Sequence, residues 1–244
     1  MREDAASFSN RKIVTRRKRS SAAPVFGLWL FLLFCSIMAA YFFIHSPYFN
    51  IQTMKVTGNH TLSSEEVTKL SGLMTGINIF QADAAGAILK IELNPNVKDA
   101  TIKRRLPSTL LFQITERVPE ALIVGQGGFI LVDNESVYLQ KIQDLQDQKL
   151  PIISGITVAD SQKPGTIIDK EGLTTALKLI ALLDKSFLQN VVEINAPSSL
   201  SLSLKTIQGV EVRFGQPIDL ERKISLMESL LFKNGAVINS DTVE

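Results

Sequence analysis

Cysteine is nearly absent from this sequence of 244 residues, and the one cysteine, Cys35, lies inside an apolar run near the N-terminus. A single thiol cannot form a disulfide within the chain, so no covalent cross-link stabilises the folded part. The residues from about Pro47 to Glu244 are numerous enough for one large or two small domains. We expect two, each held together by its apolar core alone.

Histidine is almost as rare, with only His45 and His60. Neither has a cysteine or a second histidine at the spacing of a metal site, so we expect no bound metal. The sequence also lacks a Gly-x-Ser-x-Gly elbow, a phosphate-binding glycine loop and a dinucleotide fingerprint, and Ser-x-x-Lys occurs only at Ser9 to Lys12. We therefore predict no cofactor, no small-molecule substrate and no enzymatic activity.

Charged side chains are missing from the whole run Val25 to Ile44. A helix of this length, about 30 Å, spans the hydrocarbon core of a bilayer. A cleavable signal peptide is the alternative, but its apolar part is normally shorter, at about 7–15 residues. We expect an uncleaved transmembrane helix over 25–44.

Basic residues precede this segment, whereas only Lys55 follows it closely. The bias places residues 1–24 in the cytoplasm as a basic tail and the rest of the chain on the other side of the membrane. Nucleic-acid binding is the alternative for such a run, but bases beside a membrane helix set topology and contact anionic lipid. The residues to which we assign this role are Arg11, Lys12, Arg16, Arg17, Lys18 and Arg19.

Residues 49–119 show a strand, two helices and two more strands. Ile51 to Val56 alternates as a strand does, and Ser63 and Asp83 precede amphipathic helices at about 64–73 and 84–93. Strands over 97–105 and 109–116 follow, separated by a proline that favours a hairpin turn. The order β-α-α-β-β predicts a three-stranded sheet with both helices on one face.

Residues 120–244 form a second, strand-rich region. Short apolar runs separated by turn residues predict strands at 121–124, 129–132, 137–139 and 150–153. Helical spacing predicts one helix over 172–188, and three further strands follow at 191–194, 200–204 and 210–214. Asp219 then precedes a last helix that ends at Asn234-Gly235. The whole chain is therefore predicted to be an α+β protein with an N-terminal transmembrane helix and two helices in the second region.

These residues resemble the FtsQ/DivIB family of bacterial cell-division proteins over nearly the whole chain. Turn residues, core positions and a Glu-Arg-x-Pro segment match the POTRA domain of that family in order and spacing, and Val212 to Ile224 is similar to the end of its β domain. Most of these matches are structural glycines, prolines and apolar residues. The positions of the POTRA motif are Val56, Gly58, Asn59, Gly76, Phe80, Pro107, Glu116, Arg117 and Pro119.

The resemblance implies a noncatalytic scaffold of the division machinery at the septum. Members bind two other single-span proteins, FtsL and FtsB (or DivIC), and help to control septal peptidoglycan synthesis. In the family the partner adds a strand at the C-terminal edge of the β domain. The partner-binding candidates carried over are Leu231, Lys233, Ala236, Val237 and Ile238. Family members usually continue into a further strand, which residues 120–244 do not show in full. We expect that this strand is lost, that Val237-Ile238 and Thr242-Val243 are its remnant, or that the sequence is incomplete at this end.

POTRA-like domains also occur in envelope transport and secretion machinery, which is the alternative function. That reading predicts an attached β-barrel or further repeats, and this length has room for neither.

Overall fold

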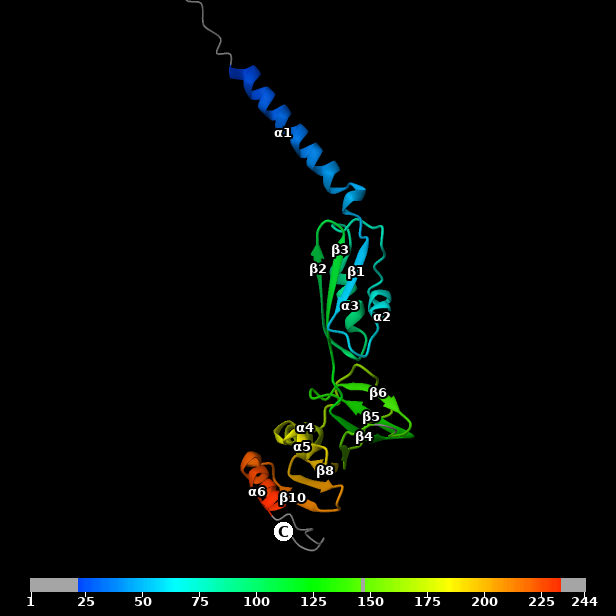
Figure 1. Cartoon of the computed structure of the whole chain (residues 1–244), viewed down its shortest axis with the longest axis vertical. Helices are drawn as coiled ribbons and strands as arrows, with labels where there is room; N and C mark the ends of the chain where they lie inside the picture. Colours follow the sequence, from blue (N-terminus) through cyan, green and yellow to red (C-terminus); the bar gives the residue numbers. More distant parts are fainter. Residues whose placement is uncertain (1–21, 146–147, 234–244) are drawn as a thin grey trace, which may run out of the picture.

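The computed structural model describes residues 22–145 and 148–233, and they begin with one long helix (Figure 1). Helix α1, Ala22–Ile44, is the one helix in these ranges that is long and apolar enough to cross a membrane, over Val25–Ile44. Its side chains are exposed from residue 25 onward, as expected for a helix whose surroundings are lipid. A short 3-10 helix, Pro47–Phe49, leads into the folded part.

The first folded unit has the β-α-α-β-β order expected from the sequence. Its elements are β1, Thr53–Thr57; α2, Ser64–Ser71; α3, Ala84–Glu92; β2, Val97–Arg105; and β3, Thr109–Glu116. The sheet order is β1-β3-β2, with β1 parallel and β2 antiparallel to β3. The connection from β1 to its parallel partner β3 must be long, and it contains α2, α3 and β2.

Both helices of this unit begin at a side-chain cap. The hydroxyl of Ser63 accepts from the N–H of Glu66, whose carboxylate accepts in return from the N–H of Ser63. Asp83 accepts from the N–H of Gly86 at the start of α3. These bonds satisfy N–H groups that a first helical turn leaves unpaired. The two helices cover a core whose fully buried members include Val67, Ile79, Ile91, Leu110 and Phe112.

The second folded unit is built on a seven-stranded sheet of order β10-β9-β8-β7-β4-β5-β6. Its strands are β4, Ala121–Gly125; β5, Gly128–Val132; β6, Tyr138–Ile142; β7, Ile152–Ser154; β8, Val191–Ser198; β9, Ser201–Thr206; and β10, Glu211–Gly215. The short strand β7 pairs in parallel with both β4 and β8. It therefore joins two antiparallel halves into one sheet.

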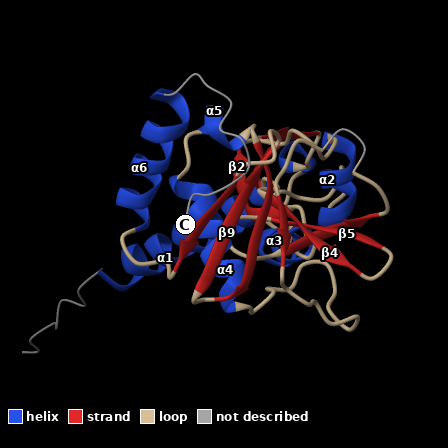
Figure 2. Ribbon diagram, turned by 90° about the horizontal axis from the view of Figure 1, so that it is seen from below, coloured by secondary structure: helices blue, strands red, loops and turns tan. Residues whose placement is uncertain are grey.

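Helices α4, Glu171–Leu182, and α6, Leu220–Lys233, pack against the β8-β9-β10 half of this sheet (Figure 2). The prediction of a single helix over 172–188 is wrong in one respect, because helix α4 ends at Leu182. Leu183 and Asp184 are extended, and Asp184 accepts from the N–H of Ser186 to start the short helix α5, Lys185–Leu188. A cap inside the apolar pattern thus divides the predicted helix.

The predicted fold class is confirmed: α+β, with an N-terminal apolar helix, a β-α-α-β-β unit and a strand-rich unit with helices. Figure 1 shows α1, the first unit and the second unit following one another along the long axis of the molecule. The sheet edge formed by β10 consequently lies at the opposite end of the molecule from α1.

Candidate functional site

Strand β10 is an open edge of the second sheet. It pairs with β9 on one side, and no strand among the described residues pairs with its other side. The register places Val212 opposite Leu204, and Thr206 donates to the carbonyl of Val210. Because antiparallel hydrogen bonds alternate, the N–H group of Glu211, which lies between Val210 and Val212, points away from β9. An open strand edge of this kind is a template onto which another extended chain can add.

Helix α6 follows this strand and is fixed against it by one buried stripe. Leu220, Ile224 and Met227 are buried, at four- and three-residue spacing, in the same core as Phe214 of β10. Lys223 adds a polar link, since its Nζ donates to the carbonyl oxygens of Phe214 and Gln216, both at 2.8 Å. The end of β10 and the start of α6 are therefore joined by a shared apolar core and two hydrogen bonds.

A second apolar stripe of α6 faces solvent. Leu226 is 55% exposed and Leu230 is 44% exposed. At about 100° per residue they lie on the same side of the helix as Lys223, which contacts the end of β10. With Ile218, 61% exposed just before the helix, these leucines form an apolar surface beside the open edge. The helix predicted between Asp219 and Asn234 includes Leu226 and Leu230, but the sequence pattern alone does not distinguish its exposed face from its buried one.

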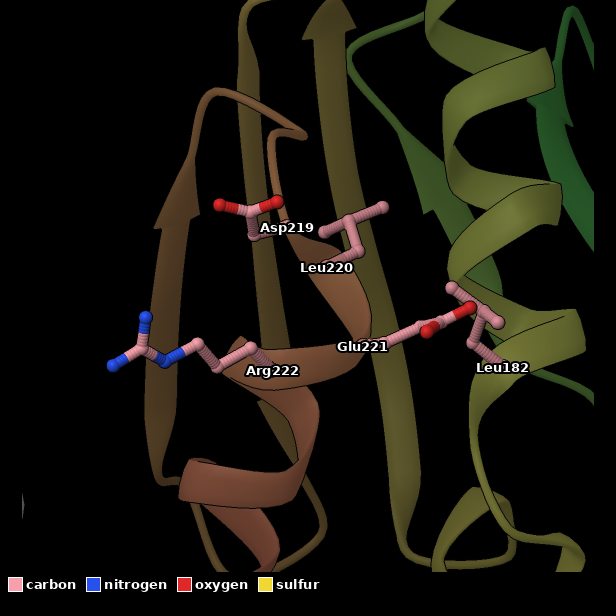
Figure 3. A pocket seen from close by; sticks show the side chains of 5 residues that line it. All are labelled: Leu182, Asp219, Leu220, Glu221 and Arg222. Carbon is pink, nitrogen blue, oxygen red and sulfur yellow. The ribbon is translucent and has the colours of Figure 1, made fainter.

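A shallow hollow lies between the end of α4 and the start of α6 (Figure 3). Leu182, Asp219, Leu220, Glu221 and Arg222 line it. Figure 3 shows Glu221 directed toward Leu182 and Arg222 directed toward β10, so the two charges diverge. None of these five side chains is a serine, cysteine or histidine nucleophile, and the hollow offers no converging set of catalytic groups.

The partner-binding residues expected from the sequence lie at or beyond the end of α6. The backbone of Leu231 and Lys233 belongs to the last turn of that helix. Ala236, Val237 and Ile238 lie outside the described residues. The topology-setting bases are also outside the described ranges: Arg11, Lys12, Arg16, Arg17, Lys18 and Arg19.

The motif residues of the first unit build its turns. Gly58 has φ of 82°, and a Cβ there would lie 2.1 Å from the carbonyl oxygen of Ile114, so only glycine fits. Asn59 donates to the carbonyl of Leu62. Val56 is partly buried against the core, and Phe80 contacts Phe49. Gly76 has a positive φ of 88°. Pro107 lies in the β2–β3 turn, and Pro119 lies between β3 and β4.

Glu116 closes the turn after β1 from the end of β3. Its carboxylate accepts from the backbone N–H groups of His60, Thr61 and Leu62 at 2.9, 2.7 and 2.9 Å. Partial burial raises the pKa of this carboxyl, but the three donors outweigh burial and hold the pKa below its ordinary value. Glu116 is therefore a structural carboxylate and not a proton donor at neutral pH.

Arg117 joins the two folded units. Its Nη1 lies 2.5 Å from Asp133 Oδ2 and 2.7 Å from Glu135 Oε2, and Lys98 Nζ lies 2.8 Å from Glu135 Oε1. The Lys98 ammonium and the Arg117 guanidinium hold the pKa of Glu135 below its ordinary value. Asp133 is 1% exposed and also accepts from the N–H groups of Glu135 and Val137. We refer to Lys98, Arg117, Asp133 and Glu135 as the junction cluster.

Neither histidine lies in a cluster of metal-binding groups. Within residues 22–145 and 148–233, the structure contains no group of three or more His, Cys, Asp or Glu side chains that could hold a metal ion. His45 Nδ1 lies 2.9 Å from the carbonyl oxygen of Tyr41 in the last turn of α1. The surfaces with the clearest potential for binding are thus an open strand edge and an apolar helix face.

Two family models match the chain, one on each folded unit. Residues 49–117 match the model described as "POTRA domain, FtsQ-type". Residues 121–240 match the model described as "Cell division protein FtsQ/DivIB, C-terminal". Their boundary falls between Arg117 and Ala121, where the structure passes from the first unit to the second.

The relatives to which this chain is similar in sequence are cell-division proteins. The chain is 28% identical over 207 residues to the cell division protein DivIB of Clostridium tetani, covering 83% of this chain and 77% of that protein. It is 29% identical over 189 residues to the cell division protein FtsQ of Syntrophotalea carbinolica, covering 76% of this chain and 66% of that protein. A solved structure of the major extracytoplasmic domain of DivIB from Geobacillus stearothermophilus aligns with half of this chain and 99% of that domain, with 14% identity and a TM-score of 0.33.

Proposed function

The chain belongs to the FtsQ/DivIB family of bacterial cell-division proteins, and from this membership we propose that it is a noncatalytic scaffold that assembles other membrane-anchored division proteins. The proposed partners are FtsL and FtsB or DivIC, and the proposed outcome is control of septal peptidoglycan synthesis. The N-terminal tail lies in the cytoplasm, and both folded units lie on the opposite side of the membrane at the division septum.

The observation that carries this proposal is the open edge of β10 beside the apolar face of α6. An added strand can accept a main-chain hydrogen bond from the outward N–H group of Glu211, and Leu226 and Leu230 offer a contact for apolar side chains of the same partner. Lys223 holds this strand and helix in a fixed relation. A preorganised surface of this kind lowers the ordering cost of binding.

Proline substitution at the edge tests strand addition directly. Glu211→Pro removes an outward N–H and leaves the β9-facing donor of Val212 in place. Glu211→Ala removes the same side chain, which pairs with Arg213 at the surface, but keeps the N–H. We expect E211P to abolish co-purification of FtsL- and FtsB-like proteins with the full chain and E211A to retain it. Equal retention by two folded variants would contradict strand addition at β10.

The cellular role and the topology require separate tests. Depletion of the protein in its own host should block septation and give filamentous cells, and normal septation would exclude a division role. A reporter fused after Glu244 should be active on the outer side of the membrane. Activity only in the cytoplasm would reverse the proposed orientation without affecting the proposed partners.

A further inference from the structure

The first folded unit presents one end to α1, and three segments form that end. They are the short 3-10 helix Pro47–Phe49, the loop of residues 76–83 that precedes α3, and the β2–β3 turn around Leu106. Strand β1 leaves this end, β3 runs parallel to it, and β2 returns to it. Figure 1 shows the β2–β3 turn on the side of the unit nearest to α1. We call this surface the proximal end.

The proximal end is bonded directly to the last turn of α1. Asn78, 7% exposed, donates from Nδ2 to the carbonyl oxygen of Ile44 at 2.8 Å. The ring of Phe49 lies edge-on to Phe43 of α1, with centroids 5.2 Å apart, and 5.3 Å from the ring of Phe80. Backbone bonds from Ile79 to Phe49 and from Ile51 to Ile77 join the loop to the chain leaving α1. These contacts hold the loop at the end of the helix.

This attachment fixes the depth of the proximal end. If Val25–Ile44 fills the hydrocarbon core, Ile44 lies at its boundary. Groups within a few ångströms of Ile44 then lie in the headgroup layer, which adds about 5–8 Å to each side of the core. Asn78 and its loop neighbours are in that position whichever side of the membrane the unit occupies.

Apolar side chains at the proximal end are exposed in the protein alone. Tyr48 is 60%, Ile77 39%, Phe80 43% and Leu106 58% exposed. Aromatic and large aliphatic side chains are favoured at the boundary between headgroups and hydrocarbon. The same residues in contact with water would be an unfavourable apolar patch, so their position next to Ile44 favours lipid as the covering phase.

The charge at the proximal end suits an anionic surface. Lys103 and Arg105 are exposed and lie on either side of Arg104 along β2. Because side chains alternate between the two faces of a strand, Lys103 and Arg105 project from the sheet face opposite the helices. Arg104 instead donates to the carbonyl oxygens of Ile79 and Ala82, which ties the end of β2 to the loop. Asp83 is the one acid in segments 47–50, 76–83 and 103–109, and its carboxylate caps α3.

We propose that the proximal end is a second membrane contact, in which Tyr48, Ile77, Phe80 and Leu106 enter the headgroup layer of the bilayer that α1 spans while Lys103 and Arg105 bind anionic phospholipid. The contact is independent of partner binding at β10. It holds the first unit against the bilayer instead of leaving it free at the end of a tether.

Site-specific fluorescence on the full chain in nanodiscs tests this contact. Cys35→Ser leaves a background free of cysteine, into which Leu106→Cys is introduced and labelled with an environment-sensitive dye. The matched control is Leu93→Cys. Leu93 is 80% exposed and lies two residues before Pro95, which is close to Gly165 of the second unit. In discs of phosphatidylcholine and phosphatidylglycerol, we expect acrylamide to quench the Leu106 dye at least about threefold less than the Leu93 dye. Spin-labelled headgroups should quench the Leu106 dye selectively.

A charge-reversal pair tests the lipid chemistry. Lys103→Glu with Arg105→Glu should raise acrylamide quenching at Leu106 in the anionic discs, whereas Lys178→Glu with Lys205→Glu, two exposed lysines of the second unit, should not. Thermal unfolding of each variant verifies that it is folded. Equal quenching at Leu106 and Leu93, protection that appears only after another protein is added, or protection unchanged by the Lys103 and Arg105 reversal would each overturn the proposal.

Discussion

At the scale of single residues, Glu116 shows how one carboxylate can hold a long connection in place. It lies at the end of β3, yet its three backbone donors belong to the turn between β1 and α2, more than fifty positions earlier in the chain. Charged acceptors of this kind make stronger hydrogen bonds than neutral ones. Two residues at the end of β3 therefore hold the turn around Gly58 in place. Gly58 fits closely against the backbone of Ile114, and Glu116 accepts the hydrogen bonds of the residues that follow it.

Replacing Glu116 by glutamine should destabilise the chain by about 1–2 kcal/mol at pH 7, because a neutral amide cannot serve three donors. The pKa of Glu116 is lowered in the folded protein, so its contribution is complete above the ordinary carboxyl pKa of about 4.3 and is lost as the pH falls through the folded pKa. Urea unfolding at pH 7 and at about pH 3 measures this.

The difference in stability between the wild type and Glu116→Gln should narrow in acid. Glu120→Gln is the matched control, since among the described residues the Glu120 carboxylate has no hydrogen bond. A difference that is the same at both pH values would show that shape, and not charge, explains the role of Glu116.

Sequence reasoning reached some single-residue roles and missed others for a definite reason. The cap at Ser63 and the acids after it are local signals, so the helix start was predictable. The partner of Arg117 was not predictable, because Asp133 lies sixteen positions away in a different unit and only the fold brings the two together. Long-range ion pairs leave no periodic trace in the sequence.

At the scale of elements, the strands flanking the Leu106-Pro107-Ser108 turn were predicted with their observed bounds, because the turn residues mark both ends. The helix over 172–188 was predicted without its break, since Leu183 and Leu188 continue the apolar spacing across Asp184. The parallel pairing of β7 with β4 and β8 could not be predicted either. Alternation identifies a strand but carries no information about which strand it pairs with.

The exposed stripe of α6 gives a prediction about partner affinity. Leu226→Glu with Leu230→Glu should weaken binding of an FtsL- and FtsB-like complex at least about tenfold, because charges replace an apolar contact at the interface. Stability should change by less than about 0.5 kcal/mol, since both leucines face solvent in the free protein. Titration of the full chain in detergent with the purified partner complex measures both affinities.

The control for this stripe is a substitution on another face of the same helix. Ser225→Glu places the same charge on an exposed position that lies away from Lys223 and β10. It should leave the affinity unchanged. Equal weakening by Ser225→Glu would mean that added negative charge, and not loss of the apolar stripe, reduces binding.

At the scale of the whole molecule, the junction cluster decides whether the two folded units behave as one body. Asp133 is buried and satisfied by Arg117 and by two backbone donors, and Lys98 extends the cluster to β2 of the first unit. Because the four side chains come from both units, their bonds cross the short connection between β3 and β4. We expect a narrow distribution of angles between the units.

Asp133→Ala should destabilise the second unit by about 3 kcal/mol and broaden the distance between the units, because it leaves the Arg117 guanidinium without its buried partner. Pulsed electron–electron double resonance measures this distance distribution. The spin labels are attached to cysteines that replace the exposed Leu93 and Leu200, one in each unit, in the Cys35→Ser background.

Asp144→Ala serves as the control, since Asp144 lies after β6, away from the junction cluster. It should leave the distance distribution narrow. A wild-type distribution as broad as that of Asp133→Ala would exclude a rigid junction and would leave the two units joined only by the chain.

The bond from Asn78 to Ile44 has a further consequence for the geometry of assembly. Because this bond restricts rotation of the first unit relative to α1, rotation of that helix about its own axis changes the direction in which the β10 edge faces within the membrane plane. Strand β2 alone spans about 30 Å along the molecule. The β10 edge therefore lies at a fixed distance from the bilayer surface. A partner anchored in the same bilayer therefore meets this edge at one height. Binding then requires only that the two proteins have the correct relative rotation about the membrane normal, so fewer orientations have to be sampled before they associate.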